Sequence, residues 1–151
     1  MKRREFITLL SGAAMVGPRA AFAQSPSKLY RLGTLTPAAP LNEKTPTGAM
    51  LLQGLEQRGY AIGKNLSLEA RAAMGQVSKL PTLVRELKAA NVDVVVVTGF
   101  PAALACKVEN IPTVVALGAG DPVATNLIDG LSRPGGSITG ISDDSTALST
   151  K

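Results

Sequence analysis

The sequence predicts an α/β protein built on a doubly wound, parallel, five-stranded sheet. Strand-like and helical segments alternate regularly along the chain, which predicts parallel strands joined by right-handed crossovers. Residues 92–97 are almost entirely valine, as is typical of a strand buried on both faces. The composition is 45% hydrophobic but only 3% aromatic, so the core must be made of Val, Leu, Ile and Ala.

The first strand and helix occupy residues 29–59. A strand over 29–36 ends at a proline-rich turn. Thr45 as N-cap and Pro46 in the first turn begin a helix that stops at Gly59. The candidate core residues of the strand are Leu29, Leu32 and Leu35. The apolar residues of the helix, whose spacing is helical, are Met50, Leu51, Leu52 and Leu55.

A second strand and helix follow over 65–90. Residues 65–73 alternate between apolar and polar side chains, which predicts a strand near the sheet edge with one wetter face. The helix over 78–90 is amphipathic, and it tolerates Pro81 because that residue lies in its first turn. Its predicted buried stripe is Leu80, Leu83, Val84 and Leu87.

The valine-rich strand over 92–98 is predicted at the centre of the sheet. It passes through a tight turn into a short helix over 101–108. A fourth strand over 112–117 and a helix over 122–131 come next, and a fifth strand over 137–142 completes the sheet.

The first 23 residues have the pattern of an export signal. A basic start, a short apolar stretch and the small residues around Phe22 predict cleavage after about Ala23. The apolar stretch is shorter than the about 20 residues that a membrane-spanning helix needs. Arg3-Arg4-Glu5-Phe6-Ile7 resembles a twin-arginine signal, and a general secretory signal is the alternative. We therefore expect a soluble periplasmic product, without an intrachain disulfide because Cys106 is the single cysteine.

Most of the net positive charge of the chain lies in this segment. It holds four of the sixteen basic residues and one of the eleven acidic residues, so its removal lowers the net charge from +5 to +2. The remaining charge does not indicate a nucleic-acid partner.

No catalytic or metal-binding pattern is evident in the sequence. Histidine is absent, which excludes histidine-based triads and metal sites within the chain. Cys106 lies among apolar residues at helical spacing and is interpreted as core filler rather than as a nucleophile. Asp143 and Asp144 are adjacent, so their side chains point apart, and they are interpreted as solvated charge. We expect no cofactor, no metal and no enzymatic activity.

The candidate ligand-binding residues follow the ends of the strands, because ligands of open α/β sheets lie at the carboxyl edge. Thr98 either caps the short helix or offers its hydroxyl to a ligand. Asp121 either caps the next helix or accepts hydrogen bonds from a ligand. A dinucleotide site is disfavoured, because Val123 stands where the pattern after Gly118 needs a third glycine. The candidates are Thr36, Pro37, Thr98, Gly99, Phe100, Pro101, Gly118 and Asp121.

Several motifs stand in a fixed order along nearly the whole chain. They are Gln53-Gly54-Leu55, Gly59-Tyr60, Leu80-Pro81, Pro101-Ala102-Ala103, Ile111-Pro112, Gly120-Asp121-Pro122-Val123 and Arg133-Pro134-Gly135-Gly136. Together they resemble the periplasmic substrate-binding proteins of an ABC-transporter family related to the tryptophan- and tyrosine-type binding proteins. The resemblance implies the type I binding-protein fold, in which two α/β lobes trap a ligand between them. It also implies that the turns after the first, third and fourth strands form one wall of that cleft.

The resemblance covers one lobe. It implies that residues 24–142 are the N-terminal lobe, that 143–151 are a crossover tail cut short, and that the second lobe is missing. The implied function is the solute-binding component of an ABC importer, which captures a small amino-acid-like solute for a permease in the inner membrane. Since closure around a ligand needs two walls, a non-functional truncated remnant is an alternative. A small α/β enzyme that binds a phosphorylated ligand is a third interpretation, and the oligomeric state stays open.

Overall fold

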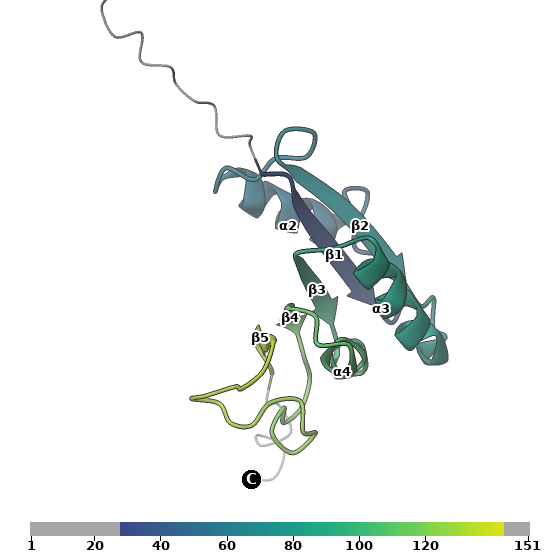
Figure 1. Ribbon diagram of the computed structural model, residues 1–151, viewed down its shortest axis with the longest axis vertical. Helices are drawn as coiled ribbons and strands as arrows, with labels where there is room; N and C mark the ends of the chain where they lie inside the picture. The colour runs from purple at the N-terminus through teal and green to yellow at the C-terminus, as the bar shows by residue number, and fades with distance from the viewer. Residues whose placement is uncertain (1–27, 144–151) are drawn as a thin grey trace, which may run out of the picture.

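The computed structural model describes residues 28–143, so the predicted export signal and most of the predicted tail lie outside the described residues. Five strands form one parallel sheet, as predicted, and their order in the sheet is β2-β1-β3-β4-β5 (Figure 1). The strands are β1 (Tyr30–Thr36), β2 (Leu66–Ala72), β3 (Val94–Thr98), β4 (Thr113–Leu117) and β5 (Ile138–Gly140). The helices are α2 (Pro46–Glu56), α3 (Leu80–Ala89) and α4 (Phe100–Val108), and the 3₁₀ turn η1 (Val77–Lys79) precedes α3. Within residues 28–143, no helix has the length and apolar character needed to cross a bilayer.

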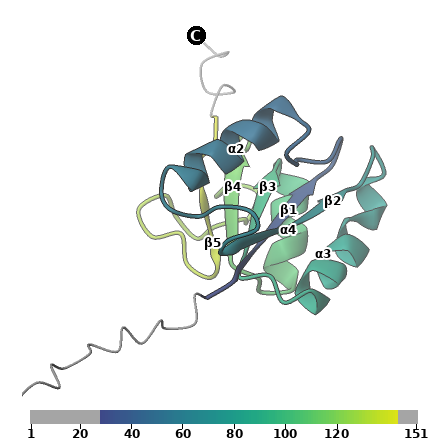
Figure 2. The same ribbon diagram turned by 90° about the horizontal axis from the view of Figure 1, so that it is seen from above.

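The sheet is doubly wound, because helices cover both of its faces. Figure 2 shows α2 on one face and α3 and α4 on the other. From β1 the chain moves outward to β2, then returns across the sheet to β3 and continues to β4 and β5. The direction of winding therefore changes between β1 and β3, and ligands of such sheets bind in the crevice beside this point.

Two apolar clusters lie on the two faces of the sheet. Val95 and Val97 point into the larger cluster, under α3 and α4, and neither is exposed. Val96 points to the opposite face and joins the smaller cluster under α2. Because side chains of a strand alternate between faces, this arrangement explains why the valine run shows no polar alternation.

Two apolar residues of the predicted elements, the core candidate Leu29 and the helix residue Met50, are exposed. Leu29 precedes β1 and is 51% exposed, since no helix or strand of the described chain covers this entry to the sheet. Met50 is 72% exposed. The inner face of α2 is formed by residues 48, 51, 52 and 55, at the i, i+3, i+4, i+7 spacing of one helix face, and Met50 lies outside that set.

The predicted helix over 122–131 is wrong, because this segment is a series of turns. It begins as one helical turn, in which Thr125 N–H donates to Asp121 C=O. Asn126 then adopts a left-handed conformation with φ of 54°, which ends the helical path. The reversal lets Leu127 reach the large cluster, where it is only 2% exposed. Burial of this side chain outweighs the local helical preference.

Other boundaries differ by a few residues. The predicted fifth strand over 137–142 is assigned as strand only over 138–140, although backbone hydrogen bonds to β4 and to the turn after it continue through Asp143. The valine strand begins at Val94 rather than at residue 92, since Asp93 still belongs to the connection from α3. The short helix begins one residue earlier than predicted, at Phe100.

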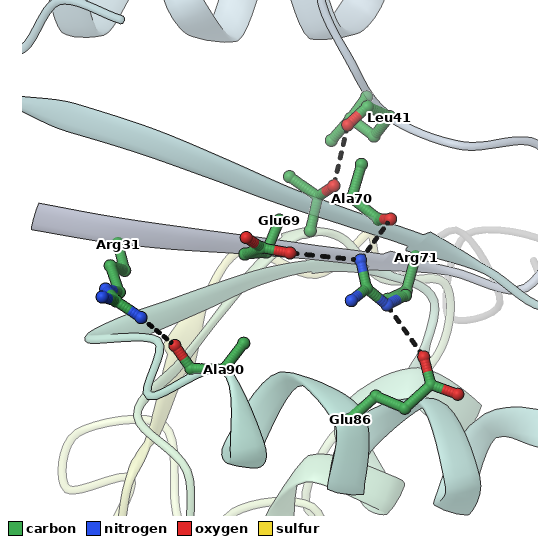
Figure 3. A network of polar contacts seen from close by, with 8 residues as sticks. Arg31, Leu41, Glu69, Ala70, Arg71, Glu86 and Ala90 are labelled. Atoms are coloured by element: carbon green, nitrogen blue, oxygen red, sulfur yellow. Dashed lines mark hydrogen bonds and ion pairs between the residues drawn. The ribbon is translucent and has the colours of Figure 1, made fainter. Parts of the chain in front are cut away.

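A polar network connects the edge strand β2 to α3 (Figure 3). Arg71 on β2 donates from Nε to Glu86 Oε2 of α3 at 2.9 Å and lies 3.3 Å from Glu69 Oε2. At the start of β1, Arg31 Nη1 donates to the carbonyl of Ala90, the C-cap of α3, at 2.8 Å. The Arg71–Glu86 and Arg31–Ala90 contacts join α3 to β2 and β1.

Candidate ligand-binding edge of the sheet

The turns after β1, β3 and β4 form one continuous rim at the carboxyl edge of the sheet. Gly99, after β3, donates its N–H to the carbonyl of Leu117 at the end of β4, at 2.6 Å. A Cβ placed on Gly99 would lie 3.7 Å from Cγ of Pro37, which follows β1. The structure therefore brings together the three turns that the sequence predicts as the wall of the site.

Gly99 gives this rim a helix N-terminus. It is the N-cap of α4 and has a φ of +80°, which a residue with a Cβ adopts only under strain. Pro101 is exposed in the first turn. Proline lacks an N–H, but first-turn N–H groups make no bond within the helix, so no hydrogen bond is lost. The remaining first-turn N–H groups of α4 have no partner within the helix and carry its positive dipole end. They can hold a carboxylate or another small anion.

Thr98 is half-buried beside that N-terminus. Of its two predicted roles, capping is not observed, because α4 has no side-chain cap and Gly99 takes the N-cap position. Among residues 28–143, the Thr98 hydroxyl makes no hydrogen bond. The second role, as donor or acceptor to a ligand, stays a prediction.

The threonines at the end of β1 have internal partners instead. Thr36 is 4% exposed, and its hydroxyl donates to the Ala39 carbonyl at 2.5 Å. Thr34 is fully buried and donates to the Leu41 carbonyl at 2.7 Å. Both hydroxyls hold the loop between β1 and α2, so of this strand Pro37 is the candidate that reaches the rim.

Asp121 is exposed and acts as a cap. Its Oδ1 accepts from the N–H groups of Val123 at 2.8 Å and Ala124 at 3.1 Å, as its structural role predicts, although the helix that it was expected to cap is only one turn. One carboxylate oxygen is therefore occupied. The other oxygen makes no hydrogen bond to residues 28–143, and the residue is exposed.

Phe100 lies beneath the rim rather than on it. It is 8% exposed, and its ring packs so closely on Gly118 that a Cβ there would come within 2.3 Å of Phe100 Cε1. Phe100 also lines a mainly apolar pocket of about 160 Å³ between β5 and residues 122–134. Phe100 and Gly118 thus position the turns after β3 and β4 against each other.

One part of the rim was not anticipated from the sequence. Met74 and Gly75, after β2, donate their N–H groups to the carbonyls of Ala38 and Pro37, at 3.1 and 2.8 Å. Met74 is 68% exposed with a φ of 52°. The position of Met74 just after a strand could have identified it, since all parallel strands end at the same edge.

The ionisable groups with shifted pKa values lie away from this rim. Burial raises the pKa of the Cys106 thiol to about 11, which fits a core residue and not a nucleophile. The backbone N–H of Arg31 lowers the pKa of Asp93 at the opposite end of β1. Within the part of the chain that the structure describes, His, Cys, Asp and Glu side chains form no cluster of three that could hold a metal ion.

A doubly wound sheet with a helix N-terminus at its carboxyl edge is typical of α/β lobes that bind small molecules. Comparison with known proteins narrows this class. The chain matches the family described as ABC transporter substrate binding protein over residues 43–150. It belongs to that family.

Individual relatives agree with this assignment. A tyrosine-binding protein of Clostridioides difficile strain R20291 is 26% identical over 94 residues, which are 61% of this chain and 27% of that protein. A conserved domain protein of Vibrio cholerae has a solved structure with 31% identity and a TM-score of 0.67, over 77% of this chain and 39% of that one. A domain of Streptococcus pneumoniae, solved in complex with L-Trp, is 28% identical with a TM-score of 0.62, over 76% and 38%. The chain thus spans well under half the length of these relatives.

Proposed function

We propose that this chain forms one wall of the solute site of an ABC importer and captures a small, amino-acid-like solute without chemical conversion. The solute would be delivered to a permease in the inner membrane, which places the working protein in the periplasm. Family membership supports a substrate-binding role. The printed descriptions of two relatives, one tyrosine-binding and one bound to L-Trp, support an amino acid as the solute.

The half-buried hydroxyl of Thr98 carries this proposal. It lies at the point where the winding of the sheet changes, directly before the N-terminus of α4. Helix N–H groups suit the carboxylate of an amino acid, and the hydroxyl and the unoccupied oxygen of Asp121 suit its ammonium group. Since a second wall is needed to enclose the solute, this lobe by itself is expected to bind weakly, so millimolar solute is used in the test.

Thermal shift with L-amino acids tests the proposal. A ligand that binds the folded state raises the melting temperature once its concentration exceeds its dissociation constant. We expect stabilisation by L-tyrosine or L-tryptophan, and the Thr98→Val variant should bind about tenfold more weakly, since a hydrogen bond to a charged group contributes roughly 1.5 kcal/mol or more. Thr98→Ser should retain binding.

The matched control is Thr36→Val. Because the Thr36 hydroxyl donates to a loop carbonyl, this variant should lose stability but keep the wild-type affinity per folded molecule. Equal affinities for wild type and Thr98→Val would contradict the role of Thr98. Stabilisation by sugar phosphates or nucleotides in place of amino acids would favour an enzyme of phosphorylated substrates instead.

A further inference from the structure

One residue of the rim has a backbone conformation that its side chain does not favour. Among residues 28–143, four residues other than glycine have a positive φ, between 52° and 54°. Three of them are asparagines, whose short polar side chain tolerates the left-handed region: Asn91, Asn110 and Asn126. The fourth is Met74, whose Cβ is crowded by the following carbonyl oxygen without the local hydrogen bonds that an asparagine can make. Strain of this kind is found preferentially at functional sites.

Backbone hydrogen bonds hold Met74 in this conformation and fix it to the rim. Its N–H donates to Ala38 C=O at 3.1 Å, and the N–H of the next residue, Gly75, donates to Pro37 C=O at 2.8 Å. Pro37 in turn lies beside Gly99, the N-cap of α4. The turn after β2 is therefore connected through the loop after β1 to the helix N-terminus of the candidate site.

The side chain of Met74 contributes little to the core. It is 68% exposed and belongs to neither apolar cluster. The other exposed methionine of the described chain, Met50, lies in the regular helix α2, where the backbone is not strained. Packing within residues 28–143 does not account for a methionine at position 74, since a glycine or an asparagine would adopt the same turn with less strain.

The chemistry of the rim indicates what this side chain contacts. Of the candidate residues at the strand ends, Asp121 alone is charged, and Pro37 and Pro101 offer apolar rings. A thioether is unbranched and polarizable, and its contacts with aromatic rings are favourable. We propose that Met74 determines the specificity of the solute site by contacting an aromatic side chain of the bound amino acid. This inference rests on the proposed function, in which Thr98 and the start of α4 hold the main-chain groups of the solute.

Calorimetric melting of the ligand-free 151-residue chain tests the strain. Met74→Asn should raise the melting temperature by about 2–4 °C, because asparagine tolerates the left-handed region. Asn110→Met is the matched control, since it places a methionine at a φ of 54° at an exposed position beyond the far end of α4. That variant should melt at a lower temperature than the wild type. A melting temperature of Met74→Asn at or below the wild-type value would overturn the proposal.

Titration calorimetry with L-tryptophan tests the contact. Met74→Asn should raise the dissociation constant about threefold to tenfold, through loss of the sulfur–aromatic contact. Met74→Leu keeps a large apolar side chain and should bind more tightly than Met74→Asn. L-alanine, which shares the main-chain groups of the solute, should bind equally to the wild type and to Met74→Asn. Met50→Asn is the matched control for an exposed methionine and should keep the wild-type affinity for L-tryptophan.

The outcomes separate this inference from the proposed function. If the wild type binds L-tryptophan and Met74→Asn binds it with the same affinity, the role of Met74 is overturned and the proposed function stands. The same conclusion follows if the substitution weakens L-alanine and L-tryptophan by the same factor, because the effect would then not depend on the solute side chain. A wild-type chain that binds no amino acid at millimolar concentration overturns both.

Discussion

At the scale of single residues, the rim depends on close approach rather than on charge. Gly118 allows the turn after β4 to lie against the Phe100 ring, and Gly99 supplies a backbone conformation that other residues avoid. The two glycines have different structural roles. Gly118 leaves out an atom that would clash, whereas Gly99 permits the sharp entry into α4.

Two glycine substitutions distinguish the steric effect at Gly118 from the effect of helix propensity. Gly118→Ala should destabilise the protein by about 1–3 kcal/mol, because its Cβ would lie 2.3 Å from Phe100 Cε1 in a packed site. Gly54→Ala is the control, since Gly54 lies inside α2 and an added Cβ would lie 3.8 Å from its nearest contact, Arg58 Nη1. That variant should gain about 0.5–1 kcal/mol from its higher helix propensity. Urea denaturation measures both, and an unchanged stability for Gly118→Ala would mean that the Phe100 ring moves freely.

At the scale of elements, Asp93 joins the start of β1 to the start of β3. Its carboxylate accepts from Arg31 N–H at 2.8 Å and lies 3.3 Å from Lys28 Nζ. The Arg31 backbone bond, the largest cause, lowers the pKa of Asp93 from its ordinary 3.8. Because the side chain is 38% exposed, solvent screens the interaction and limits its contribution.

The pH dependence of stability follows from this lowered pKa. A carboxyl group with a lower pKa in the folded state stabilises the protein above its unfolded pKa and loses that effect as the pH falls through the folded value. The free energy of unfolding should therefore decline below about pH 4. Asp93→Asn should remove part of this decline and cost at most about 1 kcal/mol at pH 7. Denaturation at pH 7 and pH 3 measures the difference, and identical pH profiles for the two proteins would exclude Asp93 as a source.

At the scale of the whole molecule, one sheet joins two apolar clusters into a single unit. β3 contributes to both, since Val95 and Val97 lie on one side and Val96 on the other. The two tyrosines, Tyr30 and Tyr60, are in edge-to-face contact at 5.2 Å, beside the cluster under α2. Their fluorescence, in a chain without tryptophan, reports on the side of the sheet opposite to α3.

A substitution on the α3 side of the sheet tests whether the two apolar clusters unfold together. Leu87→Ala removes a fully buried side chain of α3 and should destabilise the protein by about 2–5 kcal/mol. If the sheet couples both clusters, the unfolding midpoint measured by tyrosine fluorescence and the midpoint measured by far-UV circular dichroism should fall by the same amount. Val108→Ala, at a position 86% exposed, is the control and should change little. Separate transitions for the two probes would mean that the clusters unfold independently.

The sequence by itself determined the sheet, its parallel strands and the edge at which the candidate site lies. These features are written in local patterns: a valine run for a strand buried on both faces, alternation for the edge strand β2, and glycine or proline at each turn. Short motifs also carried the resemblance to the family, and the match of the family model over residues 43–150 confirmed that resemblance.

Only the tertiary structure decided which threonine hydroxyls at the strand ends have internal partners and how residues 122–131 fold. Thr34, Thr36 and Thr98 look equivalent in the sequence, but the first two donate to carbonyls of a loop that folds back on them, and Thr98 does not. Residues 122–131 leave the helical path because Leu127 is buried against elements distant in the chain. Both outcomes depend on contacts between segments far apart in sequence, and local patterns contain no information about those contacts.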